Sequence, residues 1–160
     1  MRHSWPPMER RGPAISEAAV QTFEAVIDAG LPDDFRAFLL EINGGRTAED
    51  AAVFAVGRDK TNLNSLLSLG DPDGARDLAK RNATIRDDMP PELLLIGNDD
   101  GGARVCLCIR GEHRGEVWYF DTADRRHEGS NPRVLWHDRR DMTKIADSFA
   151  AFMAALTPLG

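Results

Sequence analysis

The chain has 160 residues, enough for one domain but not for two of ordinary size. Hydrophobic residues make up 42% and charged residues 29% of it, a composition typical of a globular protein that buries its core without a disulfide or a metal. The net charge of −6 disfavours binding to nucleic acid or to anionic membrane surfaces, which needs clustered Lys and Arg, and favours attraction to a basic partner.

The two cysteines, Cys106 and Cys108, lie two residues apart on a predicted strand, so their side chains share one face. That geometry is poorly suited to a disulfide, and we expect reduced, partly buried thiols in a reducing compartment. The N-terminal residues lack the apolar run of a signal peptide, and no stretch is apolar enough to span a membrane. The expected location is therefore the cytoplasm.

Residues 1–14 contain three prolines and show no periodicity, which predicts a flexible lead-in. A first helix follows, with Ser16 as a suitable N-cap and Gly30 as a natural end. Its apolar stripe consists of Val20, Phe23 and Ile27.

The second helix begins directly afterwards. Pro32 suits the first helical position, and Asp33 and Asp34 complement the positive end of the helix dipole. The sequence Asn43-Gly44-Gly45 ends this helix with residues that tolerate positive φ. Its apolar face consists of Phe35, Phe38, Leu39 and Ile42.

The stretch 46–70 leaves two interpretations open. Residues 52–56 favour a short strand, whereas Leu63, Leu66 and Leu67 fit either a helical turn or a strand edge. A turn at 71–74 then introduces a predicted polar helix over about 75–87.

The last third alternates strands with turns. A buried strand over 93–96 is followed by a tight turn at 98–102, and the hairpin connection 111–115 joins two further strands. The predicted strands are 103–109, 116–121 and, after a polar loop at 123–132, 133–136.

The closing helix has the clearest periodicity in the chain. Its apolar face carries Ile145, Phe149, Phe152, Met153 and Leu156. The helix begins either at Met142 or only near Asp147 or Ser148. Helices segregated from a strand meander predict a single α+β domain, with the helices packed on one face of a mostly antiparallel sheet.

Five motifs in this order resemble the SUKH superfamily, the Smi/Knr-type domain, over residues 15–157. They are Leu31-Pro32-Asp33-Asp34-Phe35 with Phe38-Leu39, Asn43-Gly44-Gly45, the turn 96–102, the strand 115–121, and Ala146-Asp147-Ser148-Phe149 with Phe152. The resemblance implies a strongly bent sheet covered by helices, with no shared catalytic chemistry. It also implies a bacterial immunity protein that neutralises a toxin, or a regulator that acts through protein contacts. The stretch 46–92 and the first fourteen residues depart from the family pattern.

Reactive side chains have alternative readings. Asp99 and Asp100 could hold a metal, with His113 or His127 beside them, but Asn-Asp-Asp-Gly-Gly is also typical of a simple turn. Cys106 could pair with His113, His127 or His137 as a nucleophile, or form a zinc site with Cys108 and two histidines, yet the spacing matches no zinc motif and a packed thiol is inert. We predict no catalytic residue, metal or cofactor.

Trp118 and Phe120 point to one face of their strand and Tyr119 to the other. One of these faces is core, and the other either anchors a partner or is covered by helices. Combining this strand with the acidic turn, we predict that Asp99, Asp100, Trp118 and Asp121 form part of a partner-binding surface.

The sequence thus predicts a protein-binding module, without enzymatic activity, that neutralises a basic toxin domain such as a nuclease. It is expected to act as a monomer or weak dimer, without binding nucleic acid or membranes. The alternatives are a regulatory or adaptor domain with no toxin partner, and a small metal-binding enzyme that uses Asp99 and Asp100.

Overall fold

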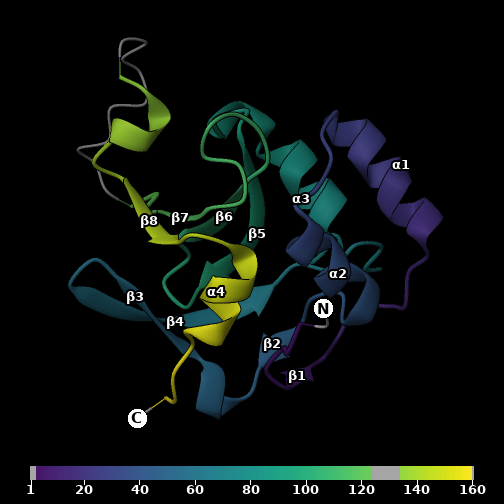
Figure 1. Cartoon of the computed structure of the whole chain (residues 1–160), viewed down its shortest axis with the longest axis horizontal. Helices are drawn as coiled ribbons and strands as arrows, with labels where there is room; N and C mark the ends of the chain where they lie inside the picture. Colours follow the sequence, from purple (N-terminus) through teal and green to yellow (C-terminus); the bar gives the residue numbers. More distant parts are fainter. Residues whose placement is uncertain (1–2, 124–133, 160) are drawn as a thin grey trace.

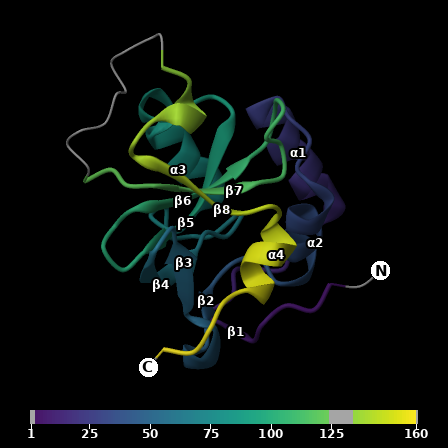
Figure 2. The ribbon, with the colours of Figure 1, turned by 60° about the vertical axis from the view of Figure 1, so that its left-hand side comes forward.

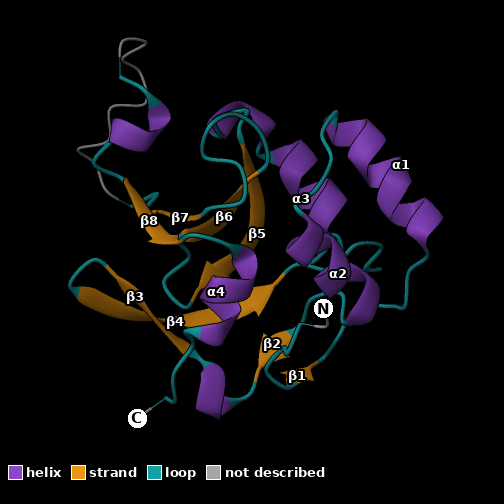
Figure 3. Cartoon of the chain, in the orientation of Figure 1, coloured by secondary structure: helices purple, strands orange, loops and turns teal. Residues whose placement is uncertain are grey.

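The computed structural model describes residues 3–123 and 134–159. These residues form four α-helices and eight strands (Figures 1 and 3). The helices are α1 (Glu17–Ile27), α2 (Asp33–Glu41), α3 (Leu78–Thr84) and α4 (Phe149–Ala154). The strands are β1 (Met8–Glu9), β2 (Arg46–Thr47), β3 (Val53–Val56), β4 (Asp59–Leu66), β5 (Leu93–Asp99), β6 (Arg104–Cys108), β7 (Val117–Phe120) and β8 (Met142–Ala146). Three 3₁₀ turns complete the set: η1 (Glu49–Ala51), η2 (Arg86–Asp88) and η3 (Trp136–Asp138).

The main sheet is a six-stranded antiparallel meander in the order β3-β4-β5-β6-β7-β8. It curves so strongly that its two edge strands, β3 and β8, come into contact (Figure 2). Register shifts interrupt three of its strand pairs, and such bulges bend the strands that carry them. Gly97 lies at one shift, where a Cβ atom would stand 2.6 Å from the carbonyl oxygen of Ser65, so no larger residue fits. The predicted α+β domain with a bent antiparallel sheet is confirmed.

The two faces of the sheet carry two separate apolar clusters. All four α-helices pack on one face, where they contribute Val20, Phe35, Leu78 and Phe149, among others, to the main core. On β6 the period-two alternation sends Val105 and Leu107 to this face, as the sequence predicts. The opposite face carries a smaller cluster, with Leu93, Cys106, Cys108, Trp118, Phe120 and Met142.

Helix α1 is capped at both ends by side chains. At its start, the backbone N–H of Ala19 donates to Ser16 Oγ (3.1 Å), which confirms the predicted N-cap. At its end, Arg110 of the β6–β7 connection donates to the carbonyl oxygens of Ile27 (2.8 Å) and Asp28 (3.0 Å). The helix ends at Ile27, with Asp28 in the left-handed region, before the predicted Gly30.

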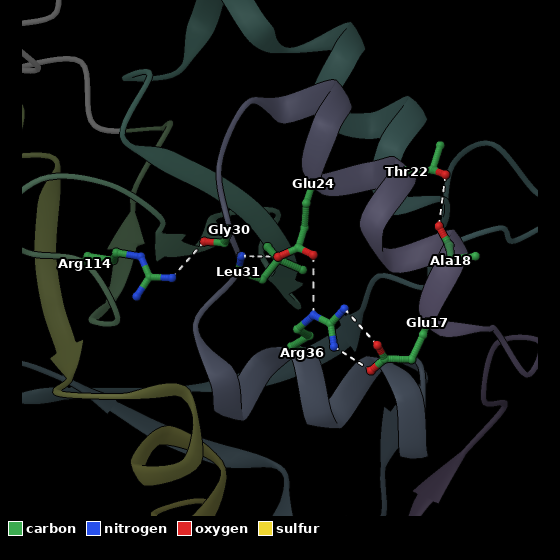
Figure 4. A network of polar contacts seen from close by, with 8 residues as sticks. All are labelled: Glu17, Ala18, Thr22, Glu24, Gly30, Leu31, Arg36 and Arg114. Atoms are coloured by element: carbon green, nitrogen blue, oxygen red, sulfur yellow. Dashed lines mark hydrogen bonds and ion pairs between the residues drawn. The ribbon is translucent and has the colours of Figure 1, made fainter.

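A polar network holds α1 against α2 (Figure 4). Arg36 of α2 donates to Glu17 Oε1 (2.7 Å) and to Glu24 Oε1 (3.4 Å), both of which belong to α1. The other oxygen of Glu24 accepts from the backbone N–H of Leu31 (2.8 Å) in the connection between the helices. Arg114 donates to the carbonyl oxygen of Gly30 (2.8 Å), so the β6–β7 connection also holds this turn.

The end of α2 has the backbone that its sequence predicts. Asn43, Gly44 and Gly45 have φ values of 65°, 80° and 117°. A Cβ atom on Gly44 would lie 2.5 Å from the carbonyl oxygen of Leu67, so this position requires glycine for space as well as for conformation. At the start of α2, Pro32 is the N-cap, one position earlier than predicted.

The N-terminal segment lies along the domain. Strand β1 pairs with β2, and the backbone N–H of Gly12 donates to the carbonyl oxygen of Asn43 (2.9 Å). Trp5 packs its ring on Phe38 and Phe149, with centroids 5.4 and 5.6 Å away, and its Nε1 donates to Glu41 Oε2 (2.8 Å). The expected lead-in 1–14 therefore includes residues that contact the core.

Three regions refine or correct the predicted elements. Residues 53–66 form the β3–β4 hairpin, so the strand interpretation is right for Leu63 and Leu66, and Leu67 directly follows the hairpin. The helix predicted over about 75–87 is shorter: it is α3, with Asp77 as N-cap, followed by η2. The strand predicted over 133–136 is wrong, because Trp136 begins η3; Arg133 and the polar loop at 124–132 lie outside the described residues.

The last strand of the sheet is β8. It contains Met142 and Ile145, two residues that the sequence also allows on the apolar face of the closing helix. Its partner β7 supplies the hydrogen bonds that make it extended, with Phe120 opposite Met142. The later of the two predicted helix starts is right: Ser148 is the N-cap of α4, and its Oγ accepts from the backbone N–H of Ala151 (3.0 Å). None of the helices in the described part of the chain combines the length and apolar character needed to cross a membrane.

Candidate partner-binding groove

Beside β4 and α3 the described residues form a polar groove of about 460 Å³. The N-terminal segment and β2 form one side of it, the loop before α3 forms another, and the β5–β6 turn lies at one end. Its lining residues are Arg10, Gly45, Arg46, Asn64, Ser65, Leu66, Leu67, Ser68, Asp71, Ala75, Arg76, Arg81, Asn98, Asp99, Asp100 and Gly102. We call it the arginine groove.

Four arginines reach the arginine groove from separate parts of the chain. Arg10 and Arg46 come together because β1 pairs with β2, and both are exposed. Among the described residues, the Arg76 side chain makes one ion pair, an exposed contact of 4.0 Å with Asp73 of a type that contributes little. Arg81 is half-buried, and its Nε is buried without a hydrogen-bond partner among the residues that the structure describes. Guanidinium groups in such a setting suit the carboxylates of a partner.

Asp99 and Asp100 occupy different environments at the end of the arginine groove. Asp99 is 4% exposed, and its carboxylate accepts from Tyr119 Oη (2.5 Å), Thr61 Oγ1 (3.0 Å) and the backbone N–H of Ala103 (2.8 Å). Those bonds fix the β5–β6 turn to the sheet. Asp100 is exposed, so of the two it is the one that a partner can reach.

Trp118 lies away from this end of the arginine groove, whereas Asp121 lies near it, because its charge helps to raise the pKa of Tyr119, whose phenol donates to Asp99. Trp118 is 7% exposed and belongs to the cluster on the opposite face of the sheet from Tyr119. Asp121 is half-buried, and its Oδ1 accepts from the backbone N–H of Ala123 (3.1 Å). The structure therefore does not bring the four predicted residues together, and a joint role for them stays a prediction.

The structure separates the carboxylates of the candidate metal site from its histidine, whereas Cys106 and Cys108 lie on the same sheet face as His113. His113 packs on Trp118, on the sheet face opposite the carboxylate of Asp99 that Tyr119 holds. His127 lies outside the described residues. Burial raises the pKa of Cys106 to about 12 and that of Cys108 to about 11, so both thiols stay protonated near neutral pH, where a thiol is a poor nucleophile.

Tyr119 provides a direct probe of the Asp99 end of the groove, because it is the one tyrosine in the chain. Burial raises the pKa of its phenol, and the hydrogen bond to Asp99 raises it further. The unfolded chain ionises at a pH of about 10, whereas the folded chain still holds the proton there. Stability is therefore expected to fall as the pH rises above that value, since the unfolded state then binds fewer protons.

Absorbance titration of the phenolate checks the raised pKa of Tyr119. We expect no ionisation of the folded protein near pH 10, ionisation at the ordinary pH in urea, and a shallower loss of stability with pH in Tyr119→Phe. An ordinary titration of the folded chain would contradict the partly buried Tyr119–Asp99 hydrogen bond.

No pattern in the sequence indicates the arginine groove as a unit. Its four arginines are spread from Arg10 to Arg81, and no local motif links them. They meet because the β1–β2 ladder and the α3 connection pass the same side of β4. A basic residue on each side of a predicted strand is too common a pattern to indicate a site without the fold.

Comparison with individual curated proteins gives no match. A family model, in contrast, matches residues 14–155, from just before α1 to the end of α4. Because this match covers nearly the whole chain and agrees with its bent α+β sheet, the protein belongs to the SMI1 / KNR4 family (SUKH-1).

Proposed function

We propose that this domain is an immunity-type protein that neutralises a cognate toxin by binding it directly, without catalysis. The observation that carries the proposal is the family match over residues 14–155. Domains of this kind act through protein contacts, as the resemblance of the five sequence motifs implies. The domain acts in the cytoplasm as a monomer or weak dimer.

The arginine groove is the proposed contact surface. It is concave and polar, and it has exposed guanidinium groups at Arg10, Arg46 and Arg76. Arginine is enriched among the residues that dominate binding energy at protein interfaces. The rigid sheet beneath the groove keeps its shape before binding, which lowers the entropy cost of association.

The proposed partner is a basic toxin domain such as a nuclease. The net charge of −6 attracts a cationic protein at long range, whereas the groove arginines pair with individual acidic side chains at short range. Asp100, exposed at the groove end, is placed to meet a basic side chain of the partner.

The neighbouring genes supply the test, because we expect one of them to encode the cognate toxin domain of this protein. Co-expression of the two is expected to restore growth that the toxin alone abolishes, and the purified pair is expected to form a stoichiometric complex. A protein that leaves the toxin fully active and does not bind it would contradict the proposal, and would favour a regulatory domain with no toxin partner.

Substitutions separate the arginine groove from the rest of the surface. Arg46→Ala and Arg76→Ala are expected to weaken the complex roughly ten-fold or more each, as expected for interface arginines. Arg58→Ala, at the exposed tip of the β3–β4 hairpin, is the matched control and is expected to bind normally. Asp100→Lys is expected to slow association at low salt. Normal binding by all three groove variants would show that the contact surface lies elsewhere on the protein.

A further inference from the structure

Two histidines and a glutamate meet on the sheet face opposite the main core. Glu112 and His113 belong to the β6–β7 connection, and His137 lies in η3. One ligand atom from each lies within 4.8 Å of the other two. His113 Nε2 and Glu112 Oε1 are 3.4 Å apart, close to the ~3.3 Å that separates two ligands of a tetrahedral zinc ion. The rings of His113 and His137 lie 4.5 Å apart, centroid to centroid.

The other nitrogen of each ring faces a carboxylate. His113 Nδ1 lies 2.9 Å from Glu116 Oε1, and His137 Nδ1 lies 3.4 Å from Asp138 Oδ1. A carboxylate on Nδ1 favours the tautomer that carries its proton there, which leaves the Nε2 lone pair free for a metal. Metal-binding histidines in proteins are commonly oriented by a carboxylate in this way.

Glu116 is itself held in place. It accepts from Trp118 Nε1 (3.1 Å), and Lys144 Nζ lies 3.3 Å from its second oxygen. These two contacts orient the carboxylate that lies beside His113 Nδ1.

We propose that Glu112, His113 and His137 bind a divalent transition metal ion of the zinc class. Zinc accepts a donor set of imidazole nitrogens and a carboxylate oxygen. Calcium and magnesium prefer sites made of oxygen atoms alone. Three protein ligands leave the fourth tetrahedral position to water.

The ion would fasten two segments that the backbone does not pair. The β6–β7 connection and η3 meet through edge-to-face aromatic contacts, with the His113 ring 5.6 Å from that of Trp136 and the Trp118 ring 4.8 Å from it. A metal shared by His113 and His137 would add a coordination link across this contact. Binding is thus expected to stabilise the fold, with a gain that rises as the logarithm of the free ion concentration once that concentration exceeds the Kd.

Zinc titration by calorimetry tests the site, with thermal unfolding as the second measurement. The wild-type protein is expected to bind one equivalent of Zn²⁺ and to unfold at a higher temperature with it. His137→Gln and Glu112→Gln are each expected to lower the affinity ten-fold or more. Glu112 is 80% exposed, so its replacement leaves the fold intact. His3→Gln, outside the cluster, is the matched control and is expected to bind as the wild type does.

Glu116→Gln distinguishes the orienting role of the carboxylate. It leaves all three ligands in place, and loss of such a contact typically lowers metal affinity about 10- to 100-fold. Calcium in place of zinc is expected to give no binding at this site. The proposal is overturned if the wild type binds no zinc, or if the double variant His113→Gln, His137→Gln binds it as tightly as the wild type.

Discussion

Replacing Phe149 by alanine is expected to lower the free energy of unfolding by about 3–5 kcal/mol, as for other buried phenylalanines. The Phe149 ring is fully buried. Its centroid lies 5.0 Å from that of Phe35, 5.0 Å from that of Phe38 and 5.6 Å from that of Trp5. Removing it leaves a cavity where the N-terminal segment, α2 and α4 meet, and these neighbours cannot all move into it.

Urea unfolding of Phe149→Ala measures this loss through the transition midpoint, with the slope as a check that the two end states are unchanged. The control is Val26→Ala on α1, where the side chain is 74% exposed and its loss is expected to change stability by no more than about 0.5 kcal/mol. Equal effects of the two substitutions would mean that α4 does not pack on α2 as described.

Elements with local signals could be predicted from the sequence. Helix α1 has its cap at Ser16 and its apolar stripe within a few residues of each other, so its start needs no tertiary contact to be recognised. The turn at Asn43-Gly44-Gly45 is equally local, since only these residues tolerate its positive φ values at low cost. The alternating faces of β6 follow from the period of a strand.

Elements that are defined by contacts with distant parts of the chain could not be predicted from the sequence. β8 carries residues that also suit a helix, and only pairing with β7 decides between the two. The cap at the end of α1 comes from Arg110, more than 80 residues away, whereas its own last turn has no basic residue. Backbone hydrogen bonds and caps of this kind are set by the whole chain, because they join segments that local propensity treats separately.

The predicted site residues illustrate the same limit. Asp99 and Asp100 are adjacent acids in one turn, yet the first is buried under Tyr119 and Thr61 and the second is exposed. Trp118 could have been an interface anchor, but it packs against Trp136, which a sequence separation of 18 residues does not reveal. Residue type suggests what a side chain can do, whereas burial decides what it can reach.

Replacing Asn43 by alanine is expected to destabilise the protein by about 3–5 kcal/mol, because its side chain satisfies three backbone groups that have been removed from water. Asn43 is 1% exposed. Its Nδ2 donates to the carbonyl oxygens of Pro13 (2.7 Å) and Leu69 (2.9 Å), and its Oδ1 accepts from the backbone N–H of Leu69 (2.8 Å). Alanine also strains the backbone, since φ is 65° at this position.

Asn43→Gly separates the two causes, because glycine adopts this φ without strain but makes none of the three side-chain bonds. In urea unfolding, Asn43→Gly is expected to be about 1–2 kcal/mol more stable than Asn43→Ala. The remaining loss of stability comes from the three backbone groups that no longer have a hydrogen-bond partner. The surface control is Asn64→Ala, whose exposed side chain lines the arginine groove. Because Asn43 joins the segments that carry Arg10, Arg46 and Arg76, its loss should also weaken partner binding at temperatures where the domain remains folded. Full stability in Asn43→Gly would mean that the side-chain bonds contribute nothing, and that conformation alone selects asparagine here.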